Sequence, residues 1–141
     1  MRKQEGFTLI ELLIVILVIA ILASIAVPVF LVQRERGWVA QSHSALKNAA
    51  TSAESYGSHH GGDYTNLDGA DSSSSNAEYD LLVDEGFKKS SSVDISLVAG
   101  AGGASFCVTA THVDLPAAHD WKVATYNSSG GSPVPDDTDA C

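Results

Sequence analysis

Gly6-Phe7-Thr8-Leu9-Ile10-Glu11 (GFTLIE) is followed directly by LLIVILVIAILASIAVPVFLV, an apolar run that extends from residue 12 to residue 32. The run contains no charged side chain, and only Ser24 and Pro28 interrupt its aliphatic character. As an α-helix, residues 7–32 would extend over about 39 Å, which is enough to cross a lipid bilayer. This stretch therefore predicts a long apolar helix that anchors the chain in a membrane.

The charges at the start of the chain set its expected orientation. Arg2 and Lys3 precede the apolar run, so the positive-inside rule keeps the N-terminus in the cytoplasm and places the rest outside. Glu11 is unusual, because a carboxylate costs up to about 2.5–3.5 kcal/mol at the centre of a membrane and less near its edge. Glu11 either lies at headgroup level, where the helix dipole favours an anion, or has a functional partner.

The GFTLIE string and the apolar run resemble the class III signal of type IV prepilins. The resemblance implies that a prepilin peptidase cuts between Gly6 and Phe7 and methylates the new N-terminal Phe7. It also implies that Glu11 is an assembly residue, which pairs with the N-terminal amine of a neighbouring subunit. Pro28 matches a proline before which the helix can melt in assembled filaments. Many pilins have glycine at the position of Ala20, so the extent of melting stays open.

Physical arguments support these roles. Gly6 has no side chain, so an extended backbone at the scissile bond can enter a narrow peptidase cleft. The cut creates an amine on Phe7, which is a natural partner for a carboxylate in an apolar environment. Because burying either charge alone is costly, the pair with Glu11 would select the register in which helices stack. Pro28 lacks a backbone donor and clashes with the carbonyl of Ser24, so a kink or local break is expected.

Two other interpretations of the N-terminus stay open. An ordinary secretory signal would use Leu12–Ala23 as its apolar region and Ser24-Ile25-Ala26 as its cleavage site. Against this interpretation, Glu11 lies at the junction where cations usually occur, and Val27-Pro28 is a poor sequence to follow a cut. The other interpretation is a membrane anchor that is never cleaved.

The rest of the sequence predicts an α+β fold, in which one long N-terminal helix packs on a small antiparallel sheet. Beyond the apolar run, small and apolar residues recur at steps of three and four, typical of a helix face that packs on a flat surface: Val39, Ser42, Leu46, Ala49, Ala50 and Ala53. Gly57 is expected to end this helix as its C-cap. A short helix is expected from the N-cap Asn76 to Gly86, where LLVDEGFKK resembles a loop helix of many pilins.

Alternating apolar residues predict three strands, at Val93–Ala99, Ala104–His112 and His119–Tyr126. Their short connections favour an antiparallel meander. In the second strand one face is expected to carry Phe106, Val108 and Ala110. In the third strand one face is expected to carry Trp121, Val123 and Thr125.

The expected organisation has four parts: a cleaved leader (1–6), the membrane and filament-core half of the helix (7–32), its amphipathic half (33–57) and a globular head (58–141). The head comprises a loop over 57–92, the sheet over 93–126 and an irregular C-terminal loop over 127–141. If the head lies outside the cytoplasm, Cys107 and Cys141 are expected to form a disulfide. Loop-entropy arithmetic gives this disulfide a stabilisation of roughly 3–4 kcal/mol.

The acidic composition restricts the partners of the chain. The net charge is −9 and the pI is about 4.7. Loss of the leader, which carries Arg2, Lys3 and Glu5, would change the net charge to −10. Such a surface repels phosphate backbones, so the bulk of the head is not expected to bind nucleic acid.

Metal-ligating and catalytic patterns are weak. Three aspartates near the C-terminus offer the oxygen ligands that Ca²⁺ prefers: Asp136, Asp137 and Asp139. Major pseudopilins bind calcium in a C-terminal loop, but this run lacks the glycine turn of a recognisable calcium motif. His59, His60 and Asp63 are better explained as part of a solvated loop. No nucleophile, phosphate-binding or paired-carboxylate motif occurs, so the sequence predicts neither a cofactor nor an enzyme.

The expected function is therefore structural: a subunit of a homopolymeric type IV pilus that serves adhesion, motility or DNA uptake. The resemblance implies a precursor in the cytoplasmic (inner) membrane and an extracellular pilus after assembly. It also implies that the prepilin peptidase and an assembly ATPase with its platform protein act on the chain. Two alternatives stay open: a pseudopilin of a type II secretion system, and a monomeric membrane-anchored extracytoplasmic binding domain.

Overall fold

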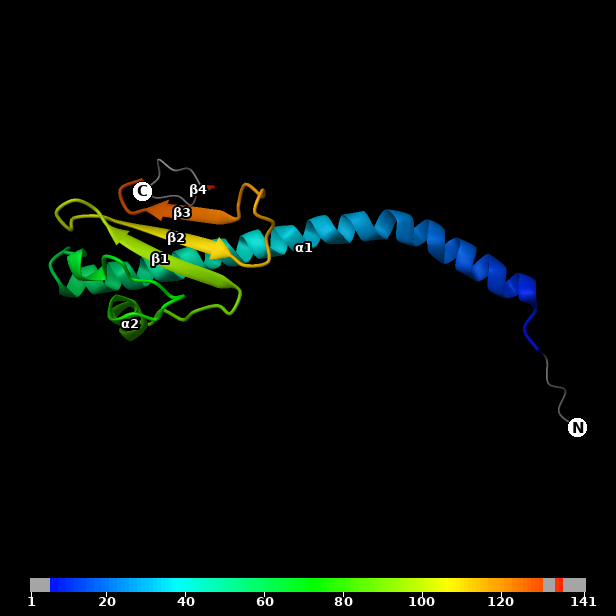
Figure 1. The fold of residues 1–141 in the computed structure, drawn as a ribbon, viewed down its shortest axis with the longest axis horizontal. Coiled ribbons are helices and arrows are strands. Elements are labelled where there is room, and N and C mark those ends of the chain that lie inside the picture. The colour runs from blue at the N-terminus through cyan, green and yellow to red at the C-terminus, as the bar shows by residue number, and fades with distance from the viewer. Residues whose placement is uncertain (1–5, 131–133, 136–141) are drawn as a thin grey trace, which may run out of the picture. The chain divides into compact units, whose positions relative to one another are not determined.

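The computed structural model describes residues 6–130 and 134–135, and its element order is a long helix, a short helix and an antiparallel sheet (Figure 1). The helices are α1 (Leu9–His59), the 3₁₀ turn η1 (Thr65–Leu67) and α2 (Ala77–Asp84). The strands are β1 (Val93–Ala99), β2 (Phe106–His112), β3 (Val123–Asn127) and β4 (Val134–Pro135). The chain divides between Arg36 and Gly37 into two compact units. We call their described parts the N-terminal segment (6–36) and the head (37–130 with 134–135).

The helix of the N-terminal segment runs without interruption through Pro28. The local break expected at this proline is therefore not found in the isolated chain. The φ angle of proline is compatible with a helix, so the helix can continue although Ser24 O loses the hydrogen bond that it would have accepted from residue 28. Ser24 turns its own hydroxyl to Ile21 O, 2.7 Å away. The role of Pro28 in assembly stays a prediction.

In the head, α1 ends at His59, beyond the predicted C-cap Gly57. That prediction is wrong, because the left-handed residues that end the helix are Gly61 (φ 67°) and Gly62 (φ 83°). The amide of Gly62 donates to Gly57 O at 2.8 Å, the long backbone bond of a Schellman motif. Gly57 itself is a buried helical residue that lies against the ring of Tyr64.

Two glycines of α1 should respond oppositely to replacement by alanine. In Gly57→Ala, the new Cβ would lie 2.5 Å from Tyr64 Cε1, a buried ring, so we expect the free energy of unfolding to fall by about 1–3 kcal/mol. In Gly37→Ala, the new Cβ meets nothing within 4 Å, so helix propensity should raise stability by up to about 1 kcal/mol. Urea titration of the two detergent-solubilised variants measures both changes. A stabilising Gly57→Ala would contradict the close contact with Tyr64.

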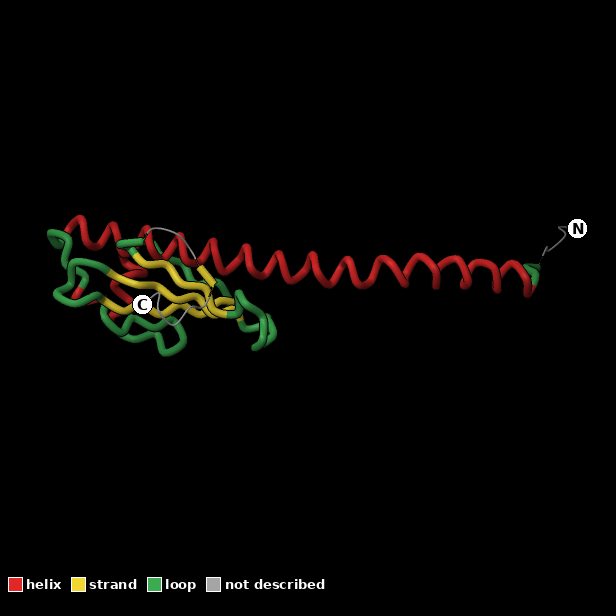
Figure 2. Tube along the Cα trace, turned by 90° about the horizontal axis from the view of Figure 1, so that it is seen from above, coloured by secondary structure: helices red, strands yellow, loops and turns green. Residues whose placement is uncertain are grey.

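The head is held together by packing of α1 on one face of the sheet, as Figure 2 shows from above. The predicted helix face is confirmed from Ser42 to Ala53, whereas Val39 is only partly buried. Most of the buried residues on this face are alanine or serine, so the helix backbone can lie close to the sheet. The sheet contributes its inward-facing side chains to the core: Val93, Ile95, Leu97, Phe106, Val108, Ala110 and Ala124.

The sheet has the order β1-β2-β3-β4 with every pair antiparallel, so the predicted meander is confirmed. β1 has the predicted bounds, while β2 and β3 begin later because turns precede them. The predicted face of β3 is confirmed for Val123 and Thr125, which alternate along the strand, but not for Trp121. Trp121 lies in the preceding turn, where Lys122 N donates to His119 O at 2.8 Å, and it packs against the core from there. The strand itself turns Ala124 and Tyr126 to the core side.

The C-terminal segment, expected to be wholly irregular, contains β4. This two-residue strand pairs with β3, with Pro135 opposite Ala124 and Val134 opposite Thr125. The prediction missed it because two residues show no periodicity, and because proline is tolerated at the edge of a sheet.

The predicted short helix is confirmed as α2. Asn76 accepts the amide hydrogen of Tyr79 at 3.0 Å, and Gly86, at φ 93°, lies beyond the helix end. Leu82 is fully buried and Tyr79 nearly so, which fixes α2 to the core. The side chain of Asn76 also accepts a hydrogen bond from the backbone amide of Asp71 and donates one to Gly69 O. The same side chain therefore fixes the loop before the helix.

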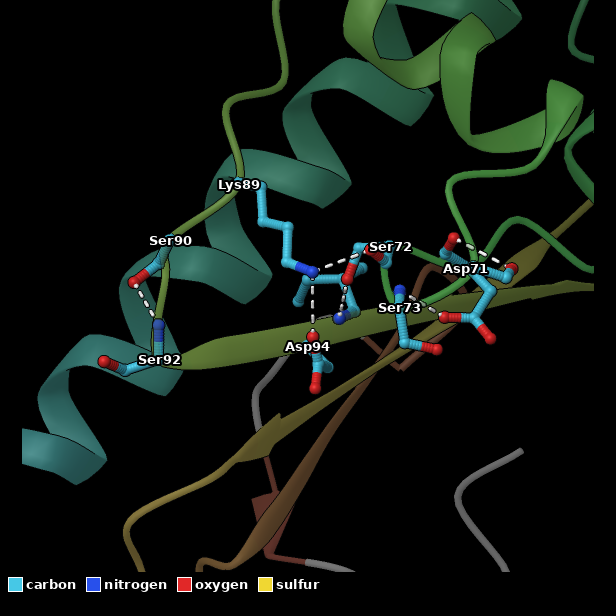
Figure 3. A network of polar contacts seen from close by, with 9 residues as sticks. Asp71, Ser72, Ser73, Lys89, Ser90, Ser92 and Asp94 are labelled. Carbon is cyan, nitrogen blue, oxygen red and sulfur yellow. Dashed lines mark hydrogen bonds and ion pairs between the residues drawn. The ribbon is translucent and has the colours of Figure 1, made fainter.

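The free edge of β1 is covered by residues 69–72, as Figure 3 shows for the part around Ser72. Ser72 N donates to Ile95 O at 2.9 Å, and Ile95 N donates back to the Ser72 hydroxyl at 2.7 Å. The ammonium of Lys89 donates to Ser72 O at 2.7 Å and lies 3.1 Å from a carboxylate oxygen of Asp94. This arrangement occupies backbone groups that an open strand edge would offer to another chain.

Candidate assembly site

Thr8 and Glu11 form a reciprocal capping box at the start of α1. The Thr8 amide and hydroxyl donate to Glu11 Oε2 at 2.9 and 2.7 Å, and the Glu11 amide donates to Thr8 Oγ1 at 3.3 Å. Two backbone donors that the helix leaves unpaired are thereby satisfied. This capping role adds to the two roles that the sequence suggests for Glu11, an anion near a helix dipole and a partner for an amine. The spacing Thr-x-x-Glu just before an apolar run is itself the signal that would have identified the box.

The capping box places the proposed cleavage bond outside the helix. α1 begins at Leu9, so Gly6, Phe7 and Thr8 precede it. Phe7 is 95% exposed, and a Cβ built on Gly6 would meet nothing within 4 Å. The bond between Gly6 and Phe7 is therefore exposed and lies outside the helix.

A continuous apolar surface follows this site. All described residues from 6 to 34 are exposed except Ala23, which is partly buried. The stretch is long and apolar enough to cross a membrane, and none of it is buried by the rest of the chain. Soluble monomers rarely expose an apolar surface of this extent, which instead marks contact with lipid or with other protein chains.

Most of the other predicted site residues lie outside the described residues. Cys107 lies on β2 and is 6% exposed, while Cys141 lies outside the described residues, so their pairing stays a prediction. The weak calcium candidates Asp136, Asp137 and Asp139 also lie outside the described residues. Within residues 6–130 and 134–135, no three metal-ligating side chains come together.

The two adjacent histidines and the nearby aspartate have separate protein partners. His59 Nδ1 lies 3.3 Å from Glu85 Oε1, and the ring of His60 stacks on Tyr56 with centroids 3.8 Å apart. Asp63 accepts the amide and hydroxyl of Thr65, which lowers the pKa of the Asp63 carboxyl. The structure thus gives each of these three side chains a local contact instead of a shared site.

The comparisons with known proteins agree with this geometry. Residues 1–27 match the family described as the prokaryotic N-terminal methylation motif. A fimbrial protein of Pseudomonas aeruginosa is 34% identical over 137 residues, which cover 95% of this chain and 75% of that protein. The type IV wide pilus major component PilA4 of Thermus thermophilus is 34% identical over 113 residues, 79% of this chain and 76% of that protein.

The chain belongs to the type IV pilin family. A further relative, the fimbrial protein EcpB of Eikenella corrodens, is 43% identical over 61 residues, 43% of this chain and 38% of that protein. No solved structure matches this pilin at a significant level. The pilin has the α+β fold that its sequence predicts, and the methylation-motif match includes the capping box and the Gly6–Phe7 bond.

Proposed function

We propose that this pilin is made as a membrane-anchored precursor, cut between Gly6 and Phe7, methylated on Phe7 and polymerised into an extracellular pilus. The single observation that carries the proposal is the exposed apolar helix directly after an accessible Gly6–Phe7 bond. Pilin relatives that align with nearly the whole chain support it. The polymer is structural, and no enzymatic activity is proposed.

Glu11 is the proposed recognition residue of assembly. Its carboxylate is held at the first turn of α1 by Thr8, on a helix whose other exposed side chains are apolar up to residue 32, apart from Ser24. In a filament core of such helices, the Phe7 amine of another subunit is the complementary charge that we propose to pair with it. Because either charge buried alone is costly, subunits would add only in the register that pairs them.

The proposed partners follow from this route. The prepilin peptidase acts on the Gly6–Phe7 bond, and an assembly ATPase with its platform protein extracts the subunit from the cytoplasmic (inner) membrane. The pilus then serves adhesion, motility or DNA uptake. We favour a pilus over the pseudopilin of a type II secretion system because the relatives are named as fimbrial or pilus components.

Intact mass and N-terminal sequencing of protein sheared from the cell surface test the proposal. We expect a chain that starts at Phe7, with the added mass of one methyl group. A further deficit of two hydrogens would report the disulfide between Cys107 and Cys141. A start at Met1 or Val27, or no protein in the sheared fraction, would overturn the polymer proposal and favour an anchored or secreted monomer.

A further inference from the structure

The end of the head where α1 enters is held by histidine contacts, unlike the rest of the interface between helix and sheet. We call this group the histidine seam: Trp38, Gln41 and His43 of α1, His112 of β2, and Trp121 in the turn before β3. The rings of Trp38 and His112 lie 5.7 Å apart, and those of His43 and Trp121 lie 4.6 Å apart, edge to face. Farther along α1, the interface includes Leu46, Ala49 and Ala53, which are fully buried and cannot titrate.

The hydrogen bonds of His112 require a neutral ring. The side chain is fully buried, and Nε2 lies 2.9 Å from the amide oxygen of Gln41. That oxygen only accepts, so Nε2 carries the hydrogen. Nδ1 in turn accepts the backbone amide of Asp114 at 3.2 Å. A proton added to Nδ1 would therefore face another donor, and one of the two contacts would be lost.

The charges around His112 act in both directions. Burial is the main cause that lowers the pKa of His112, the Asp114 carboxylate raises it, and the Lys122 ammonium lowers it. Lys122 cannot simply move away, because its Nζ donates to the backbone carbonyls of His112 and Val113. From α1, the ring of Trp38 and the amide of Gln41 contact His112, and neither side chain carries a charge. Protonation of the buried His112 ring is thus opposed by burial and by the Lys122 ammonium.

On the helix side, the surroundings of His43 also favour a neutral ring. Its Nε2 is buried without a hydrogen-bond partner, a feature that among the described side chains only Thr125 Oγ1 shares. Burial lowers the pKa of His43, and Lys47 one turn along α1 lowers it further. The ring faces Trp121, an uncharged side chain. The side chain as a whole is partly buried, so protonation would add a charge to a ring whose buried Nε2 has no hydrogen-bond partner among the described residues.

We propose that the histidine seam is an acid-sensitive contact, in which uptake of protons by His43 and His112 releases residues 38–43 of α1 from the sheet while residues 46–56 stay packed. The inference concerns the head alone and is independent of how the N-terminal segment is processed. Acid would thus open only one end of the interface between α1 and the sheet.

The direction of the pH dependence follows from the lowered pKa values. Both histidines bind protons less readily in the folded head than in an unfolded chain, whose reference pKa is near 6.5. Their contribution to stability is therefore fully present above about pH 6.5 and is lost as the pH falls through the folded pKa values.

The test uses the full-length pilin in detergent micelles between about pH 8 and pH 5. The chain has only two tryptophans, Trp38 and Trp121, and both lie in the seam, so their fluorescence reports on it. Hydrogen exchange, corrected for the intrinsic effect of pH on the rate, is compared for residues 38–43 and 46–56. We expect a fluorescence transition below about pH 6.5, with loss of amide protection confined to residues 38–43.

The variants separate the seam from general acid effects. His43→Gln with His112→Gln should keep residues 38–43 protected at the acid end, while His60→Gln, just beyond the far end of α1, should behave as wild type. An unchanged acid response in the double variant, or loss of protection along all of residues 38–56, would overturn the proposal. If the double variant fails to fold, NMR titration of the wild-type histidines decides: ordinary pKa values for His43 and His112 would equally overturn it.

Discussion

A pilin that carries Glu11→Gln is expected to enter the membrane and to be cut normally, yet to yield almost no surface filaments. Glutamine keeps the size of the side chain and accepts the Thr8 hydrogen bonds, so the helix start is preserved. It removes the charge that we propose to pair with the Phe7 amine of the next subunit. Removing one member of a buried ion pair costs about 3–5 kcal/mol, because the other charge is left buried alone. Each added subunit would incur this cost.

Glu35→Gln is the matched control, since it removes a carboxylate from the same helix outside the apolar run. It should leave filament yield unchanged. The measurement is the amount of pilin in the sheared fraction against the amount in the membrane, with N-terminal sequencing of both. Wild-type filament yield from Glu11→Gln would contradict the proposed pairing, and accumulation of uncut Glu11→Gln precursor would assign Glu11 to processing instead.

Phe106→Ala should have the largest effect on the head, lowering the free energy of unfolding by about 3–5 kcal/mol. Phe106 is 1% exposed at the start of β2, and its ring lies 4.8 Å from that of Tyr64 and 6.2 Å from that of Tyr126. Alanine would leave a cavity among aromatic rings that come from the loop after α1 and from β3. Because the backbone amide of Phe106 is kept, its hydrogen bond with the Ser128 hydroxyl should survive.

Val98→Ala is the control for this cavity. Val98 lies on the neighbouring strand β1, opposite Cys107, but its side chain is 52% exposed. Its truncation should change stability by no more than about 0.5 kcal/mol. Urea titration of the detergent-solubilised variants measures both effects. A loss below about 1 kcal/mol for Phe106→Ala would contradict the packing of its ring between Tyr64 and Tyr126.

The parts of the structure that the sequence predicted share one property: their signal is local. The apolar run from Leu12 to Val32 is read from composition, and α2 from its cap Asn76 and from Gly86. The strand β1 and the inward residues of β2 are read from simple alternation. In each case the pattern recurs among residues that are close in sequence, so it can be recognised without knowledge of distant contacts.

By itself, then, the sequence determined the membrane-length helix, the motif at Gly6–Glu11, the helix face from Ser42 to Ala53 and the antiparallel meander. Only the tertiary structure decided what distant residues do together. Gly57 proved to be a packing position because Tyr64 folds back against it, and β3 turns Ala124 inward while Trp121 packs against the core from the preceding turn. The histidine seam joins Gln41 to His112, which are far apart in the chain. Such contacts depend on which distant segments the fold brings side by side, and the local periodicity of the sequence does not indicate this.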